Sequence, residues 1–137
     1  ELTSNNQDKM EVQTSIMVVD DSINVRRFLA LILEKENYQV EQAKDGQEAL
    51  EKLQSGLKID GIISDIEMPR MDGYELLARV KADTYLKKIP VIMLTSRSAE
   101  KHRKIAFNLG ANDYFSKPFS EQKLLQTINN LIKSKVV

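Results

Sequence analysis

Four places along the 137-residue chain carry residue types that together could transfer a phosphoryl group. The acidic pair Asp20-Asp21 follows the apolar run IMVV, and a third acid, Asp65, follows the run GIIS. Thr95 follows VIML, and Lys117 comes shortly after the pair YF. Three crowded carboxylates repel one another and so imply a bound cation, and their all-oxygen character favours Mg²⁺. With the metal and the lysine neutralising phosphoryl oxygens, Asp65 is free to act as the nucleophile.

Each of these residues also has an ordinary structural interpretation. The acidic pair could cap a helix, and Asp65 could be a solvated acid in a turn. Thr95 could initiate a helix, and Lys117 could be a surface lysine. The functional interpretation is favoured because the residues occur together at four predicted strand ends, where clusters of charge indicate a site.

The segments before these residues are predicted to be β-strands. Strands are expected over residues 16–19, 38–43, 59–64, 91–94 and 114–115. The continuously apolar runs IMVV and VIML are typical of central parallel strands, whereas residues 38–43 alternate like a half-exposed edge strand. Apolar residues at helical spacing predict helices over 25–32, 49–53, 76–80, 105–109 and 124–132. Gly56 and Gly110 are expected to end the second and fourth helices, and Ser120 to cap the fifth.

Five strands alternating with five helices predict an α/β fold, (βα)5, with a doubly wound five-stranded parallel sheet. The natural strand order at this size is 2-1-3-4-5, as in flavodoxin-like folds. Ligands of such sheets bind at the carboxyl ends of the strands, which is where the acids, the threonine and the lysine are expected. Residues 15–137 should form this one domain, preceded by a flexible linker or tail over the polar residues 1–14.

Composition excludes several other classes of protein. Lys plus Arg and Asp plus Glu both number 20, so a zero net charge argues against nucleic-acid and membrane partners. The chain has no cysteine, which excludes disulfides and thiolate zinc sites and fits a reducing compartment, so we expect a cytoplasmic protein. The longest apolar run, residues 28–33, is too short to span a bilayer. A P-loop is also excluded, because Ile62-Ile63 follow the only Walker-like glycine spacing.

Four segments resemble the signatures of response-regulator receiver domains: VVDDS, DIEMPRMDG, MLTSR and YFSKPF. They occur in the family's order, and the resemblance runs from about Ser15 to about Ser134. It implies that Asp65 is the phosphoacceptor, with Mg²⁺ held by Asp20, Asp21, Asp65 and the backbone carbonyl of Glu67. It also implies that Lys117 and Thr95 bind the phosphoryl group, that Tyr114 is the switch aromatic, which would rotate inward on phosphorylation, and that the Lys117-Pro118 peptide is cis.

The resemblance also implies partners. A histidine kinase or a histidine phosphotransfer domain would donate the phosphoryl group, and a downstream protein would read the face formed by residues 105–109, 114–115 and 124–132. The domain would catalyse its own phosphorylation and dephosphorylation without being an enzyme in the usual sense. SIMVVDDSINVRR is similar to receivers fused behind chemotaxis-type hybrid histidine kinases. We therefore expect an excised C-terminal module of such a kinase, with no DNA-binding output region in this chain.

Two other function classes stay open. A receiver-like interaction module would share the fold without being phosphorylated in use, although such modules commonly lose an acid or the lysine. An Mg²⁺-dependent phosphatase similar to the haloacid-dehalogenase-like hydrolases would place D-x-D after the first strand, whereas here Asp65-Ile66-Glu67 follows the third.

The sequence also leaves undecided which side chains pair near the site. Glu67 and Arg97 could pair across the mouth of the site, or Glu67 could engage Lys117. His102 lies among Lys101, Arg103 and Lys104 and is expected to be solvated. Met17, Met68, Met71 and Met93 are expected to pack in the interior.

Overall fold

The structure is a computed structural model that describes residues 13–136. Except for Gln13 and Thr14, the predicted flexible segment over residues 1–14 therefore lies outside the described residues. The strands are β1 (Ser15–Val19), β2 (Gln39–Ala43), β3 (Gly61–Ser64), β4 (Val91–Thr95) and β5 (Asp113–Ser116). All neighbouring strands are parallel and the order is β2-β1-β3-β4-β5, which confirms the predicted topology and leaves β2 at one edge of the sheet.

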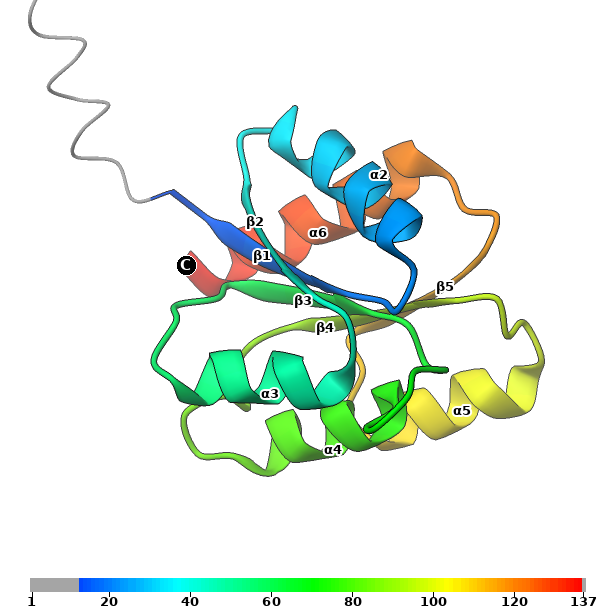
Figure 1. The fold of residues 1–137 in the computed structure, drawn as a ribbon. Helices are drawn as coiled ribbons and strands as arrows, with labels where there is room; N and C mark the ends of the chain where they lie inside the picture. The colour runs from blue at the N-terminus through cyan, green and yellow to red at the C-terminus, as the bar shows by residue number, and fades with distance from the viewer. Residues whose placement is uncertain (1–12, 137) are drawn as a thin grey trace, which may run out of the picture.

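Five helices connect the strands and cover both faces of the sheet. They are α2 (Ile23–Glu34), α3 (Gly46–Gln54), α4 (Gly73–Ala82), α5 (Glu100–Asn108) and α6 (Glu121–Val136). Helices α2 and α6 lie on one face, and α3, α4 and α5 lie on the other (Figure 1). Among residues 13–136, no helix combines the length and the apolar composition that a membrane span requires.

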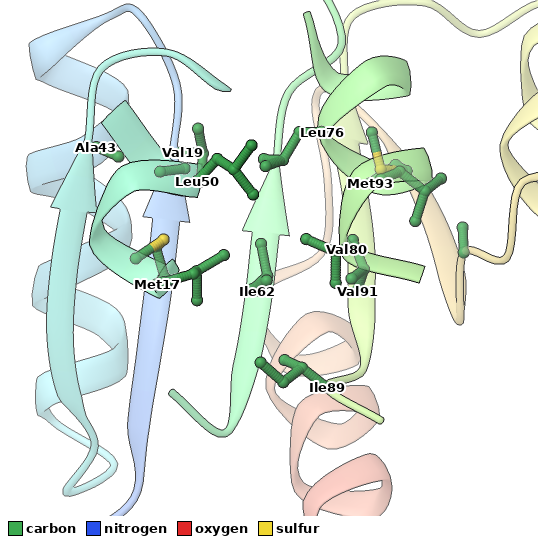
Figure 2. Packing of buried hydrophobic residues seen from close by; sticks show 14 of the residues in the cluster. Met17, Val19, Ala43, Leu50, Ile62, Leu76, Val80, Ile89, Val91 and Met93 are labelled. Atoms are coloured by element: carbon green, nitrogen blue, oxygen red, sulfur yellow. The ribbon is translucent and has the colours of Figure 1, made fainter. Parts of the chain in front are cut away.

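The alternation of side chains along each strand divides the core into two layers. Met17 and Val19 of β1 pack with α3 and α4 on one face, whereas Ile16 and Val18 pack with α2 and α6 on the other. Strand β4 divides its side chains in the same way. Figure 2 shows the first layer, in which β1, β3 and β4 meet the buried leucines and valines of α3 and α4. A continuously apolar strand is thus needed wherever both faces are covered, as predicted.

Side-chain caps begin four of the five helices. Ser22, Asp45, Asp72 and Ser120 each accept a hydrogen bond from the backbone N–H three residues further on, and the predicted cap at Ser120 is confirmed. Helix α5 differs because Ala99 stands at its start. Gly56 and Gly110 follow α3 and α5 with φ of 96° and 108°, the left-handed region in which glycine ends a helix without strain.

Candidate functional site

Three carboxylates meet at the carboxyl ends of β1 and β3. Ligand oxygens of Asp20, Asp21 and Asp65 all lie within 4.8 Å of one another. Asp20 is buried, Asp65 is half-buried and Asp21 is exposed, so the cluster opens to solvent on one side. A hard divalent cation that retains waters fits such a set of oxygens, and Mg²⁺ is the ion with this preference. The predicted convergence of the three acids is therefore confirmed.

Backbone hydrogen bonds place two of these acids by extending the sheet one residue past its strands. The Asp20 N–H donates to the Ala43 carbonyl at 3.1 Å, and the Asp65 N–H donates to the Val19 carbonyl at 2.9 Å. Asp20 Oδ1 accepts from the Ser22 N–H at 2.9 Å, and Ser22, not an acid, caps helix α2. Neither Asp20 nor Asp21 has the capping role that was the simplest structural alternative.

Lys117 follows β5 and reaches across the rim to the acids. Its Nζ lies 3.1 Å from Asp20 Oδ2 and 3.7 Å from Asp65 Oδ2, and its side chain is 25% exposed. The Lys117 N–H donates to the Thr95 carbonyl at 2.8 Å, which anchors the end of β5 beside β4. The predicted cis peptide before Pro118 is confirmed. One ammonium group thus offsets part of the negative charge and contacts two of the three acids.

Thr95 and Tyr114 lie beneath the β4–α5 loop. Thr95 is fully buried, and its Oγ1 accepts a hydrogen bond from the Arg97 N–H at 3.3 Å. Tyr114 is 6% exposed and its hydroxyl donates to the Arg97 carbonyl at 2.6 Å. Burial raises the pKa of the Tyr114 phenol. The inward position of Tyr114 was expected only after phosphorylation, but the structure already shows this side chain buried.

A partly exposed ion pair crosses the mouth of the site. The Arg97 guanidinium donates to the Glu67 carboxylate, joining the β4–α5 loop to the β3–α4 loop. This hydrogen bond is the main cause of the lowered pKa of Glu67. The pairing settles the open alternative, since Lys117 contacts Asp20 and Asp65 while Glu67 contacts Arg97.

The structure corrects the expectation for His102. Its side chain is half-buried, and its Nδ1 lies 3.1 Å from the hydroxyl of Tyr74 on α4, which also donates to the His102 carbonyl at 3.3 Å. Lys101, Arg103 and Lys104 around it are exposed, as predicted. His102 differs from them because it faces α4, a contact between residues 28 apart that the charge pattern of one helix does not report.

Two residues beside the site were not found from the sequence. Asp45, 2% exposed, accepts hydrogen bonds from Nε and Nη2 of Arg70 at 2.9 and 3.1 Å. The dipeptide Asp45-Gly46 before the predicted helix over 49–53 is a cap signal that could have identified the first of them. Arg70 carries no comparable signal, because its partner is 25 residues away.

Comparison with known proteins adds independent findings. The family model described as response regulator receiver domain matches residues 16–129. The transcriptional regulatory protein ResD of Bacillus subtilis (strain 168) is 37% identical over 123 residues, which cover 88% of this chain and 49% of that protein. The chain spans about half the length of the curated relatives it matches.

Solved structures agree with the sequence matches. The signal receiver domain of a signal transduction histidine kinase from Syntrophus aciditrophicus aligns with a TM-score of 0.82 and 36% identity, covering 88% of this chain and 91% of that one. The chemotaxis protein CheY4 of Vibrio cholerae aligns with a TM-score of 0.81 and 35% identity, covering 88% and 99% of the two chains. The similar proteins thus include transcriptional regulators, a kinase receiver and a chemotaxis protein.

Proposed function

Because the chain belongs to the response regulator receiver domain family, we propose that it accepts a phosphoryl group on Asp65 from a phosphohistidine and so acts as a signalling switch. The observation that carries this proposal is the cluster of Asp20, Asp21 and Asp65 with the Lys117 ammonium against two of them. Asp65 is half-buried within this cluster, so a donor can reach its carboxylate, and the Lys117 ammonium beside it offsets part of the negative charge.

The transfer step is a displacement at phosphorus. A carboxylate oxygen of Asp65 forms the new O–P bond while the N–P bond of the phosphohistidine breaks. The electron pair leaves with the imidazole nitrogen, which takes a proton from solvent. Water later attacks the phosphorus, which releases inorganic phosphate and restores the Asp65 carboxylate. Positioning and charge neutralisation supply most of the catalysis in such a step.

The residues around Asp65 have separate roles in this proposal. Asp20 and Asp21, with Asp65 and the Glu67 carbonyl, would hold Mg²⁺, which supplies positive charge to the phosphoryl oxygens when bound. The Lys117 ammonium already lies near Asp65 Oδ2 and would bind another phosphoryl oxygen. The Thr95 hydroxyl would leave the Arg97 N–H and donate to the phosphoryl group.

The output surface would be the exposed face of α5, β5 and α6. Thr95 and Tyr114 both hydrogen-bond to the backbone of Arg97, so movement of the threonine changes the support of the tyrosine. Arg103 also reaches the Tyr114 carbonyl at 3.4 Å, which links the basic cluster Lys101, Arg103 and Lys104 to the same unit. A downstream protein with acidic contacts would distinguish the two states, through a population shift set by its differential affinity.

The parent protein is a further part of the proposal. The segment SIMVVDDSINVRR favours a chemotaxis-type hybrid histidine kinase, with this chain as its receiver, and one similar solved structure is the receiver of a histidine kinase. The complete reading frame tests this. Kinase domains before residue 1 would support the proposal, and a DNA-binding region after residue 137, as in a transcriptional regulator, would contradict it.

Phosphorylation by a small donor tests the central claim. With Mg²⁺ and acetyl phosphate, intact-mass analysis should show one added phosphoryl group, which Asp65→Asn should abolish. Asp21→Ala, an exposed position, should keep the fold and weaken Mg²⁺ binding measured by calorimetry. Absence of labelling would favour the unphosphorylated interaction module. Sustained turnover of diverse small phosphoesters would instead favour the phosphatase.

A further inference from the structure

The loop that follows the acceptor contains a residue in an unusual conformation. Arg70, in the β3–α4 loop, has a φ of 68°, in the left-handed region that non-glycine residues seldom occupy. Such a conformation persists only where surrounding contacts determine it. For Arg70, contacts of the side chain supply this constraint.

Its guanidinium forms a two-pronged hydrogen bond with a buried acid. Nε and Nη2 of Arg70 donate to the two carboxylate oxygens of Asp45, which is 2% exposed while the Arg70 side chain is 53% exposed. Asp45 Oδ1 also accepts from the Glu48 N–H at the start of α3. A paired fork of this kind is directional, and removal of the arginine would leave a buried carboxylate partly unpaired. The contact therefore fixes both the arginine and the loop.

Backbone contacts on either side of the fork complete the attachment. The Gly46 N–H donates to the Met71 carbonyl at 3.0 Å, and a Cβ on Gly46 would lie 2.6 Å from that oxygen. The Gly73 N–H donates to the Ile66 carbonyl at 2.8 Å, which closes the loop at its base. The loop is thus fastened both to itself and to the start of α3.

We propose that the Arg70–Asp45 pair is a positioning clasp for the phosphoacceptor. The Ile66 N–H donates to Asp65 Oδ1 at 2.7 Å, so the orientation of the Asp65 carboxylate depends on the backbone of the loop. That backbone is held by Gly73 at one point and, through Arg70, by Asp45 at another. Loss of the clasp would let the loop shift and turn Asp65 away from Lys117. This inference rests on the proposed role of Asp65.

Arg70→Gly is the sharpest variant, because glycine adopts a φ of 68° without strain while the fork is removed. The melting temperature should fall moderately, because relief of strain at position 70 offsets only part of the cost of leaving the buried Asp45 carboxylate without its partner. The maximal rate of Asp65 labelling by saturating acetyl phosphate should fall about tenfold. Amide hydrogen exchange at Ile66 and Gly73 should become faster, with no change at Ile92 in β4.

Two further variants separate positioning from general stability. Arg70→Lys keeps the charge but not the fork, so its labelling rate should lie between those of wild type and Arg70→Gly. Asp45→Asn keeps an oxygen for the α3 cap but loses the charged pair. If the two residues act as a unit, Asp45→Asn combined with Arg70→Gly should be no slower than Arg70→Gly alone.

The outcomes distinguish the two proposals. If the wild-type protein is labelled and Arg70→Gly shows the same labelling rate and the same amide exchange, the clasp is overturned and the proposed function stands. A lower melting temperature at an unchanged rate would also overturn it, because the pair would then only stabilise the fold. Wild-type protein that is never labelled would overturn the proposed function, and the clasp would have no acceptor to position.

Discussion

Helices α4 and α5 lie side by side on one face of the sheet but are held in different ways. Helix α4 begins with a side-chain cap at Asp72 and buries Gly73, Leu76, Leu77 and Val80. Helix α5 begins at Ala99, which has no capping side chain, and buries Ala106. The loop before α4 carries Asp65, and the loop before α5 follows Thr95. The acceptor is thus built beside a firmly packed helix, and the proposed readout beside one that has fewer buried side chains and no side-chain cap.

Among the changes considered, substitution of Gly73 at the start of α4 should lower the stability of the chain most. A Cβ at this position would lie 2.0 Å from the Asp65 carbonyl oxygen, and the three nearest atoms all belong to the backbone, which cannot easily move aside. We expect Gly73→Ala to lower the free energy of unfolding by about 4 kcal/mol, beyond the usual cost of overpacking. Urea denaturation measures this cost.

Gly61→Ala, at the start of β3, is the matched control. There the nearest atom to a new Cβ is Ile16 Cδ1 at 3.1 Å, the mobile end of a side chain. The cost should be well below that at Gly73. Equal costs at the two glycines would show that close approach to the Asp65 loop is not what Gly73 provides.

Truncation of one apolar residue in each helix sharpens the contrast. Leu77 on α4 is fully buried, and Ile105 on α5 is 42% exposed. Leu77→Ala should cost about 3 kcal/mol through lost burial and a residual cavity. Ile105→Ala should cost below about 1 kcal/mol, since much of its surface is already in water. Similar losses in thermal or chemical unfolding would contradict the difference between the two helices.

The Arg70–Asp45 and Arg97–Glu67 ion pairs should respond differently to acid. The Arg70 hydrogen bond is the main cause of the lowered pKa of Asp45 in the folded chain. The stabilisation is therefore complete above the unfolded pKa of about 3.9 and is lost as the pH falls through the lower folded-state pKa. We expect about 1 kcal/mol, because water screens the half-exposed arginine.

Unfolding curves between pH 2.5 and 6 test this expectation. Asp45→Asn should make the free energy of unfolding fall less steeply as the pH is lowered. Glu67→Gln should leave this pH dependence nearly unchanged, because the Glu67 side chain is 61% exposed and its pair with Arg97 is screened. If Glu67→Gln weakens this pH dependence and Asp45→Asn does not, the Arg97–Glu67 pair contributes more to stability than the Arg70–Asp45 pair, contrary to our expectation.

The smallest expected effect is a gain. Ala99 has the extended backbone of a capping residue, with φ of −66° and ψ of 142°. A serine there could accept a hydrogen bond from a free N–H in the first turn of α5, so Ala99→Ser should stabilise the chain by about 0.5–1 kcal/mol. Slower amide exchange along α5 would accompany the gain. No change in either measurement would mean that the start of α5 is already well ordered.

The fold could be predicted from sequence because its main signals are local. Strand-like segments of two to six residues, helical spacing and two glycine stops were sufficient for the element order, and parallel connections restrict the topology. The convergence of Asp20, Asp65 and Lys117 then followed, since the carboxyl ends of parallel strands share one edge of the sheet.

Contacts that depend on side-chain direction could not be predicted in this way. The partner of Arg70, the turn of His102 toward Tyr74 and the burial of Tyr114 depend on how separate elements pack. The choice of Glu67 between Arg97 and Lys117 depends on distances across two loops. None of these has a periodic signature within one segment, so only the three-dimensional arrangement reveals them.

Strand β2 has a consequence for how copies of the chain behave at high concentration. An exposed strand edge is a template on which a second molecule can add a strand. A zero net charge provides no general repulsion to keep copies apart. The row Gln39, Glu41 and Gln42, with Lys52 paired to Glu41 at 2.8 Å, places polar and charged groups along this edge. The local chemistry of this edge strand therefore contributes to colloidal stability, and apolar replacements there should promote aggregation without disturbing the acidic cluster.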